Sequence, residues 1–268
     1  MLKVRILTAA VALPLFLAAM FLLPNAWWSI ALIAPLLVAG REWARLAGFT
    51  RSAEGVFLTA LLAGCALLLL PASPAAMQPA TAQAFAERAA YAISLAFWCV
   101  IAPCWLWLKL VVRQRIALAA AGLVVLLPTW LALVRLQHDA LLLLLLLGVM
   151  WTADSAAYFT GHTYGRHKLA PAVSPGKTWE GVGGAFAAVT VYALALHVSP
   201  LLTRDLPIVI AGFVSMTALS IVGDLFESWL KRNAGVKDSG GIFPGHGGML
   251  DRIDGITAAL PLAALIFI

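Results

Sequence analysis

Charged residues are scarce in this chain, and their scarcity excludes a water-soluble domain. Asp, Glu, Lys and Arg together make up 11% of the 268 residues, whereas hydrophobic residues make up 63%. A soluble domain of this length carries about 25% charged residues to cover its surface. Acidic residues are the rarer sign, with twelve against eighteen basic residues and a formal net charge of +6. The composition therefore predicts an integral membrane protein.

The sequence also has few cysteines, no evident internal repeat and no evident signal-peptide cleavage site. The three cysteines, Cys65, Cys99 and Cys104, lie in apolar stretches without metal-ligand spacing, and we interpret them as packing residues. No internal repeat supports a transporter built from repeated halves. No small-residue cleavage site follows the first apolar stretch, so we interpret that stretch as an uncleaved membrane span rather than a secretory signal.

Long apolar runs recur along the whole chain. About 20 helical residues are needed to cross the hydrocarbon core, and helices are expected because backbone groups in lipid must be satisfied within their own segment. We predict an all-α, polytopic helical bundle with about nine transmembrane helices. The predicted spans are 5–23, 26–40, 56–71, 91–112, 116–136, 140–159, 182–199, 206–226 and 253–268. The second span is short enough to be re-entrant instead.

The basic residues predict the orientation of these spans. With the N-terminus in the cytoplasm, only Arg88, Arg135 and Arg204 fall on the outside, and the other fifteen of the eighteen basic residues fall on the inside. This is the distribution that positive-inside sorting produces. The net positive charge is thus explained by topology, and we predict no nucleic-acid partner.

Acidic residues divide the chain into two regions. Residues 1–149 carry four, in or beside predicted loops, and residues 150–268 carry eight, of which all but Asp205 lie at cytoplasmic span ends or in cytoplasmic loops. We predict a transmembrane scaffold over 1–149 and a transmembrane catalytic region over 150–268. The Ala- and Pro-rich stretch 72–89 is interpreted as an external connection with little ordered chemistry.

A glycine-rich cytoplasmic loop is predicted over 160–181. Its Gly176-Lys177-Thr178 step resembles part of a P-loop, but Pro171 stands where that motif needs glycine and no buried strand precedes it. What remains is Lys177 with two hydroxyls, Ser174 and Thr178, among glycines that let backbone N–H groups approach phosphate oxygens. An ordinary basic loop that serves only topology is the alternative.

A polar stripe continues helically from the span that ends near residue 226. Its members stand at positions i, i+3, i+4 and i+7, which share one helix face; they are Asp224, Glu227, Ser228 and Lys231. Two acids at the end of a membrane helix are costly against lipid, so the stripe should face a cavity or partners. The alternative is an interfacial helix end with snorkelling side chains, but Asp224 lies too deep for that.

The run 237–254 holds five glycines and a proline within twelve residues, and such a backbone can approach a ligand closely. Asp251 and Asp254 share a face at the start of the last span, where acids also complement a helix dipole. Together with Asp224 they exceed what capping requires, and they are the hard oxygen ligands that Mg²⁺ prefers. Interleaved cations would neutralise phosphate charge; they are Lys231, Arg232, Lys237 and Arg252.

The region from Ser228 to Asp254 resembles a family signature. It reads Ser-x-apolar-Lys-Arg, four residues, Lys-Asp-x-Gly, then apolar-Pro-x-His-Gly-Gly-apolar-x-Asp-Arg-apolar-Asp. This is similar to the signature of the phosphatidate cytidylyltransferases, or CDP-diacylglycerol synthases, without departure. The upstream Ser174-Pro-x-Lys-Thr-x-Glu-Gly stretch resembles the same family, as do the length and the number of spans.

The resemblance implies an enzyme of phospholipid biosynthesis that makes CDP-diacylglycerol and pyrophosphate from CTP and phosphatidate taken from the membrane lipid. It implies a homodimer in a bacterial-type inner membrane with a cytoplasmic active site. It also implies a Mg²⁺ site with a second metal ion such as K⁺, in which Asp224 and Asp251 match the metal-binding acids and Asp254 assists.

The resemblance further assigns roles within the signature. Those assigned to catalysis are Lys237, Asp238, His246 and Arg252. Those assigned to phosphate binding are Ser174, Lys177, Thr178, Ser228, Lys231, Arg232, Gly247 and Gly248. His246 is ambiguous, because it would either donate to a phosphate, which we favour, or stabilise the glycine turn.

Two other function classes are weighed against this one. A transporter of an anionic substrate would also place acids and cations at helix ends inside the membrane, and vesicle uptake without nucleotide turnover would identify it. A lipid-alcohol phosphotransferase would carry an Asp-Gly-x2-Ala-Arg pattern, which is absent from the sequence.

Overall fold

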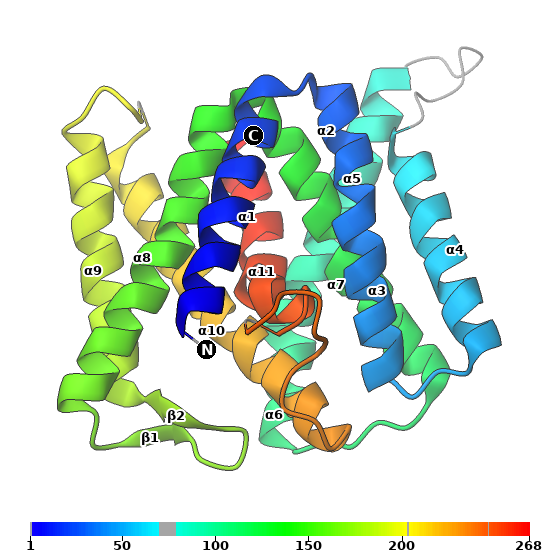
Figure 1. Cartoon of the computed structure of the whole chain (residues 1–268). Coiled ribbons are helices and arrows are strands. Elements are labelled where there is room, and N and C mark those ends of the chain that lie inside the picture. Colours follow the sequence, from blue (N-terminus) through cyan, green and yellow to red (C-terminus); the bar gives the residue numbers. More distant parts are fainter. Residues whose placement is uncertain (1, 70–78, 203, 246) are drawn as a thin grey trace.

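The computed structural model describes residues 2–69, 79–202, 204–245 and 247–268. The helices are α1 (Leu2–Leu22), α2 (Asn25–Ala31), α3 (Ile33–Leu46), α4 (Arg51–Leu69), α5 (Pro79–Ala96), α6 (Ala102–Trp107), α7 (Arg115–Leu136), α8 (Ala140–Tyr164), α9 (Trp179–His197), α10 (Leu206–Asn233) and α11 (Leu250–Phe267), with a π-helix η1 (Phe97–Ile101) and a 3₁₀-helix η2 (Gln137–Asp139). The strands are β1 (Lys168–Ala170) and β2 (Ser174–Thr178). The long helices run side by side, with the β-hairpin at one end of the bundle and the C-terminus near the other (Figure 1).

Each predicted span overlaps a helix or a run of adjoining helices among the described residues, although residues 108–112 of the fourth span are not helical. The prediction of a helical membrane bundle is confirmed. Five segments of the described residues are long and apolar enough to cross a membrane, and one of them, 115–164, contains both α7 and α8. The count of about nine is not confirmed by this criterion and stays a prediction. The second span is not re-entrant: α2 and α3 are separated only by Leu32 and together pass from the C-terminal end to the hairpin end (Figure 1).

Two regions predicted as loops are ordered differently. α5 begins at Pro79, so residues 79–89 are helical, and Glu87 there accepts a hydrogen bond at 3.0 Å from Arg135 Nε. The alanines of this stretch are strong helix formers, so the prediction of a connection with little order is wrong for these residues, whereas their placement on the outside stays a prediction. Residues 71–78 lie outside the described part of the chain.

The predicted loop 160–181 is instead largely regular structure. α8 continues to Tyr164, and β1 and β2 pair antiparallel in a register of Lys168 with Thr178 and Ala170 with Ser174. The fold is thus a helical membrane bundle, as predicted, with one short β-hairpin in place of the predicted loop. The hairpin carries Lys177 to the end of the bundle.

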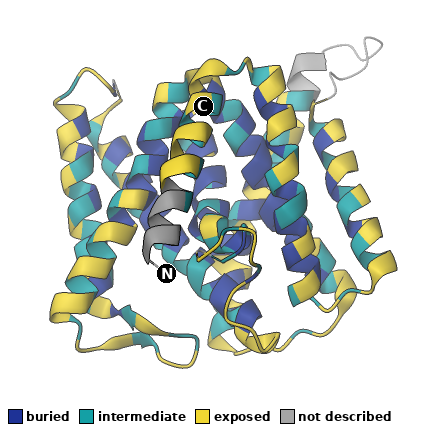
Figure 2. Ribbon diagram, in the orientation of Figure 1, coloured by how far each residue is buried: buried dark blue, intermediate teal, exposed yellow. Residues whose placement is uncertain are grey.

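An aromatic cluster joins the two halves of the chain in the core. Phe226 on α10 is buried, and its ring centroid lies 5.4 Å from those of Phe97 and Trp105 and 5.6 Å from that of Trp98. Trp43 on α3 stacks on it at 6.5 Å. Figure 2 shows the buried residues concentrated on the inner faces of the helices. Because Phe226 lies next to the polar stripe of α10, the packing of this cluster fixes the position of α10 and of its polar stripe.

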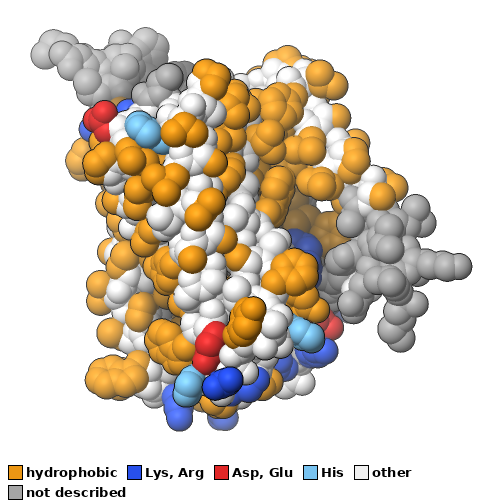
Figure 3. All heavy atoms as spheres, turned by 90° about the vertical axis from the view of Figure 1, so that its left-hand side faces the viewer, with side chains coloured by type: hydrophobic (Ala, Val, Ile, Leu, Met, Phe, Trp, Pro, Cys, Tyr) orange, Lys and Arg blue, Asp and Glu red, His pale blue; other side chains and the backbone are white. Residues whose placement is uncertain are grey.

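The outer surface is apolar along the middle of the bundle and charged at its ends. Figure 3 shows hydrophobic side chains covering one face, with Lys, Arg, Asp, Glu and His gathered mainly at the hairpin end. Large apolar side chains such as Val56, Phe85 and Val191 are more than half exposed. An exposed apolar belt of this kind is a liability in water and the normal surface of a protein in lipid.

Candidate functional site

The polar stripe of α10 forms as predicted on one helix face. Ser228 Oγ donates a hydrogen bond at 3.3 Å to Asp224 Oδ1, and Lys231 Nζ donates at 2.9 Å to Glu227 Oε2. Glu227, Ser228 and Lys231 are buried, so the stripe faces into the protein rather than toward lipid. The interpretation of these residues as a snorkelling interfacial helix end is excluded.

Asp251 at the start of α11 is the centre of a hydrogen-bond network. Its Oδ1 accepts from Lys231 Nζ at 2.6 Å, and its Oδ2 accepts from the backbone N–H groups of Ser239 at 2.9 Å and Gly248 at 2.7 Å. Ser239 Oγ also lies 3.0 Å from Oδ2. Charge-assisted bonds of this kind are about twice as strong as neutral ones, so the network fixes α11, α10 and the loop between them as one unit.

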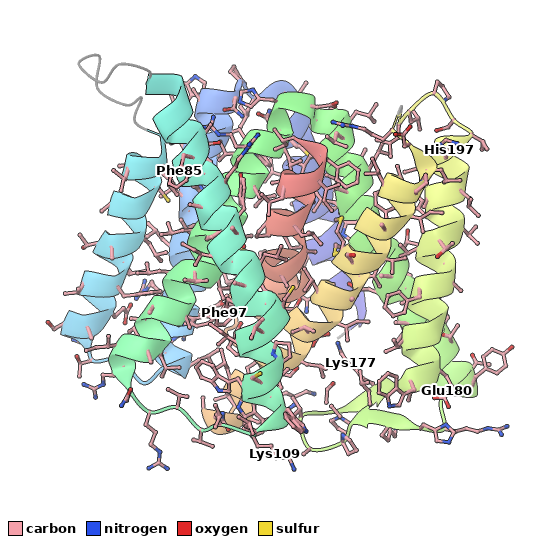
Figure 4. The ribbon with its side chains drawn as sticks, turned by 180° about the vertical axis from the view of Figure 1, so that it is seen from behind. Phe85, Phe97, Lys109, Lys177, Glu180 and His197 are labelled. Atoms are coloured by element: carbon pink, nitrogen blue, oxygen red, sulfur yellow. The ribbon has the colours of Figure 1, made fainter. Side chains whose placement is uncertain are left out.

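The β-hairpin brings a lysine to the same region. Lys177 Nζ on β2 lies 2.5 Å from Asp224 Oδ2, and Figure 4 shows the lysine extending from the hairpin toward α10. Thr178 is the N-cap of α9, where its Oγ1 accepts from Gly181 N at 3.1 Å. Arg232 Nε donates to Val173 O at 3.4 Å, which ties the hairpin turn to the end of α10. These contacts therefore fix the glycine-rich segment against α9 and α10.

A cavity of about 690 Å³, here called the hairpin cavity, opens between the hairpin, α8, α9 and α10. The chemistry-bearing residues on its wall are Asp154, Ser174, Lys177, Thr178 and Asp224. Cavities of this size hold small-molecule ligands with a few placed polar groups. The structure thus gathers four of the predicted site residues around one space and adds Asp154.

A second cavity, of about 480 Å³ and here called the apolar cavity, lies on the other side of the site. It is lined mainly by aliphatic and aromatic side chains of α1, α3, α7, α8 and α11, and the one charged residue on its wall is Arg252. Arg252 is also an electrostatic neighbour of Asp154, which lines the hairpin cavity. A cation on the wall of the apolar cavity thus interacts electrostatically with a carboxylate on the wall of the hairpin cavity.

The site holds more acidic than basic side chains. Electrostatic interactions link five carboxylates with three cations; these residues are Asp154, Asp224, Glu227, Asp251, Asp254, Lys177, Lys231 and Arg252. Glu227 Oε1 is buried without a hydrogen-bond partner among the described residues. An orphaned buried carboxylate oxygen is costly, and a bound cation would compensate it.

These donors fit a Mg²⁺ ion that keeps other ligands. Among the described residues, no three His, Cys, Asp or Glu side chains lie close enough together to hold a metal alone. Mg²⁺ is usually bound by one or two carboxylates, with water and substrate phosphates completing the octahedron. Asp224 and Asp254 are electrostatic neighbours, and Asp224 faces the hairpin cavity. The predicted metal role of Asp224, Asp251 and Asp254 stays a prediction.

The remaining predicted residues lie in the loop between α10 and α11. Lys237 and Asp238 are exposed and make no side-chain hydrogen bond or ion pair with the rest of the described chain. Gly247 has φ +84°, which only glycine adopts without strain, and its carbonyl accepts from Phe243 N at 3.0 Å to close a turn. His246 lies outside the described residues, so its role stays a prediction.

Two further residues of the site were not predicted from the sequence. Asp154 lies inside an apolar span, and an ionisable residue there is a functional candidate by default, so the signal was present. Glu42 on α3 is 2% exposed and reaches the loop that precedes α11. Nothing in the local pattern around Glu42 indicates a partner some two hundred residues away.

Known proteins resemble the chain over its full length. The sequence model of the cytidylyltransferase family matches residues 3–268. The phosphatidate cytidylyltransferase of Pseudomonas aeruginosa is 38% identical over 98% of this chain and 96% of that protein, and that of Haemophilus influenzae is 35% identical over 97% and 96%. The phosphatidate cytidylyltransferase of Thermotoga maritima is 45% identical over 46% of this chain and 48% of that protein. The similarity therefore covers the helical bundle as well as the site.

Proposed function

Because the chain belongs to the cytidylyltransferase family, we propose that it joins CTP to phosphatidate and forms CDP-diacylglycerol and pyrophosphate. The observation that carries this proposal is a pair of unlike cavities, one polar and one apolar, whose wall residues Asp154 and Arg252 interact electrostatically. The hairpin cavity offers Lys177 and hydroxyl groups to a water-soluble phosphate compound. The apolar cavity, with Arg252 on its wall, suits the chains of a lipid whose phosphate lies near the guanidinium.

The reaction is a displacement at the α-phosphorus of CTP. A phosphate oxygen of phosphatidate forms the new P–O bond, and the bond between the α- and β-phosphates breaks to release pyrophosphate. The lipid phosphate is already anionic at neutral pH, so the attack needs no strong general base. The obstacle is repulsion between two anions, and positioning with charge neutralisation supplies most of the catalysis in such transfers.

The positions of three cations support this proposal. Lys177 lies on the wall of the hairpin cavity and Arg252 on that of the apolar cavity, so each is positioned to contact one substrate. Lys231 Nζ is held between Glu227 and Asp251, 2.9 and 2.6 Å from their oxygens, and contributes a fixed positive charge to the site. Ser228 orients Asp224. The protein thus binds both anions and keeps their reacting ends together.

The proposal includes Mg²⁺ held by Asp224 and Asp251 with assistance from Asp254. Bound there, the ion would neutralise phosphate charge and stabilise the departing pyrophosphate. Excess carboxylate and the unpartnered Glu227 oxygen support a cation at this place. A second ion such as K⁺, a homodimer, and a cytoplasmic site in a bacterial-type inner membrane complete the proposal, and they rest on the family resemblance.

The reaction is tested with the detergent-solubilised protein. Given CTP, phosphatidate and Mg²⁺, it should release pyrophosphate and form CDP-diacylglycerol in equal amounts, and omission of any component or chelation of the metal should stop both. One phosphoanhydride bond is exchanged for another, so the equilibrium should lie near unity. Added pyrophosphate should therefore regenerate CTP from CDP-diacylglycerol.

Diacylglycerol in place of phosphatidate is the matched control, because it lacks the attacking phosphate oxygen. We expect no product from it. Consumption of diacylglycerol, or release of free phosphate from CTP, would contradict the mechanism. Uptake of CTP or phosphatidate into vesicles without turnover would favour the transporter instead.

A further inference from the structure

Glu42 on α3 is a buried carboxylate from the predicted scaffold region that contacts the signature loop. It is 2% exposed. Its Oε1 accepts from Met249 N at 3.0 Å, and its Oε2 accepts from Leu250 N and from Ser239 Oγ, both at 2.9 Å. Three donors thus converge on one side chain, all from the loop 239–250 that leads into α11.

These bonds make Glu42 the N-terminal cap of α11. The first N–H groups of a helix lack partners within the helix and carry partial positive charge. Met249, the N-cap residue, supplies no side-chain hydrogen bond. A carboxylate from α3 takes its place, and an anion at a helix N-terminus is favourable. The start of α11 is therefore set by a residue from the other half of the chain.

The same carboxylate is linked to Asp251 through Ser239. Ser239 Oγ lies 2.9 Å from Glu42 Oε2 and 3.0 Å from Asp251 Oδ2, and its single hydrogen can serve only one of them at a time. Ser239 N donates to Asp251 as well, at 2.9 Å. Moving Glu42 would therefore move Ser239 and, with it, Asp251 and the Lys231 ammonium that Asp251 holds.

The glycines of the loop are packed against Glu42. A Cβ on Gly240 would lie 2.1 Å from Glu42 Oε1, and its three nearest atoms would all belong to Glu42. A Cβ on Gly248 would lie 2.5 Å from both oxygens of Glu42. By contrast, a Cβ on the neighbouring Gly241 would meet nothing within 4 Å. Glycine at 240 and 248 thus leaves room for the carboxylate.

We propose that Glu42 is a positioning residue of the active site, which fixes the 239–250 loop and the start of α11 so that Asp251 and Lys231 keep their places. The inference rests on the proposed function, because its effect is read as turnover. It assigns an active-site task to α3, which the sequence pattern places in the scaffold.

The first test compares Glu42→Gln with Glu54→Gln. Glutamine has the shape of glutamate, but an NH₂ group replaces one of the two carboxylate oxygens. That group cannot accept a hydrogen bond and would face a backbone N–H, which is also a donor. We expect kcat to fall by roughly 10- to 100-fold, the size usual for residues that orient metal ligands, and the Mg²⁺ concentration for half-maximal rate to rise. Glu54 pairs with Arg41 on the surface of α3 and α4, so Glu54→Gln should change neither.

The second test keeps the Glu42 carboxylate but shifts its position. Gly240→Ala should lower kcat because the three atoms nearest to its methyl group belong to Glu42, whereas Gly241→Ala should leave kcat unchanged. A double variant, Glu42→Gln with Ser239→Ala, should lose less than the product of the single losses, because both act through one network. Melting temperatures in detergent are measured for every variant. They show whether a fall in turnover exceeds the fall in the amount of folded protein.

The outcomes separate this inference from the proposed function. A wild-type protein that forms no CDP-diacylglycerol overturns the function. Wild-type turnover with unchanged kcat in Glu42→Gln and Gly240→Ala overturns the role of Glu42 alone. A loss of turnover that only matches the loss of folded protein, or single losses that multiply in the double variant, also overturns it. A fall in kcat at native melting temperature with a raised Mg²⁺ requirement supports it.

Discussion

Asp224 and Asp251 carry the same charge on neighbouring helices, but their surroundings differ. The side chain of Asp224 is 37% exposed and faces the hairpin cavity, with Lys177 as its ion-pair partner. The side chain of Asp251 is 7% exposed and accepts bonds from Lys231, Ser239 and Gly248. One carboxylate is thus available to a ligand, and the other also supports the structure.

This difference predicts different effects of the same substitution. Asp224→Asn should reduce turnover roughly a thousandfold, because a carboxylate that meets phosphate charge through a metal is worth several kcal/mol in the transition state. Its melting temperature should stay near that of the wild type. Asp251→Asn should reduce turnover and also stability, since removing one partner of a buried ion pair costs about 3–5 kcal/mol. Turnover and thermal unfolding in detergent measure the two effects.

Asp205→Asn is the matched control for both variants. Asp205 is exposed at the start of α10, and its side chain does not cap that helix. We expect wild-type turnover and stability from it. Equal losses of stability in Asp224→Asn and Asp251→Asn would contradict the prediction that only Asp251 also stabilises the fold.

Among the secondary-structure elements, α8 and α9 form the wall of the hairpin cavity and meet through glycines. A Cβ on Gly181 would lie 2.8 Å from the backbone oxygen of Ala157, an atom that cannot move without moving α8. A Cβ on Gly183, two residues along α9, would meet nothing within 4 Å. Close helix approach through small residues is a usual way of packing membrane helices.

Gly181→Ala should therefore separate α8 from α9 and disturb the cavity between them. We expect a lower melting temperature and a higher KM for CTP, because Lys177 and Thr178 lie directly before α9. Gly183→Ala should be neutral or stabilise by about 0.5–1 kcal/mol, since alanine is the better helix former. Thermal unfolding and CTP kinetics of the pair provide the measurement. Identical behaviour of the two variants would refute the close contact.

The elements differ in how far the sequence predicted them. α4 and α10 follow from apolar runs, because lipid requires a nearly unbroken apolar helix. The β-hairpin does not, because β1 has only three residues and its pairing has an irregular register. The contacts of Glu42 with Met249 and Leu250 span 207 and 208 positions. Local patterns report neighbours along the chain, so they predicted the shared helix face of the α10 stripe and gave no sign of Glu42.

For the molecule as a whole, the predicted scaffold over 1–149 and the predicted catalytic region over 150–268 pack against each other. Trp43 on α3 stacks on Phe226 of α10, and Glu42 next to it caps α11. α11 also packs against α5 and α7. The two regions therefore share one core, and we expect neither to hold the site alone.

The two ends of the bundle differ in charge, and this difference predicts the orientation in the membrane. The three basic residues assigned to the outside, Arg88, Arg135 and Arg204, lie at or near the end opposite the hairpin, as expected from the directions of α5, α7 and α10 (Figure 1). Positive-inside sorting then places the hairpin end, with Lys177, in the cytoplasm. CTP would reach the site from that side.

Single cysteines test this orientation in a background without Cys65, Cys99 and Cys104. Val198 is 85% exposed after α9 at the end opposite the hairpin, and Gln114 is exposed before α7 at the hairpin end. An impermeant maleimide applied to intact cells should label Val198→Cys and should label Gln114→Cys only after permeabilisation. The reactivity of both introduced cysteines is checked in the detergent-solubilised protein, where both should be labelled. Labelling of Gln114→Cys in intact cells would place the site outside, where CTP is not supplied, and would contradict the proposed reaction in this membrane as well as the orientation.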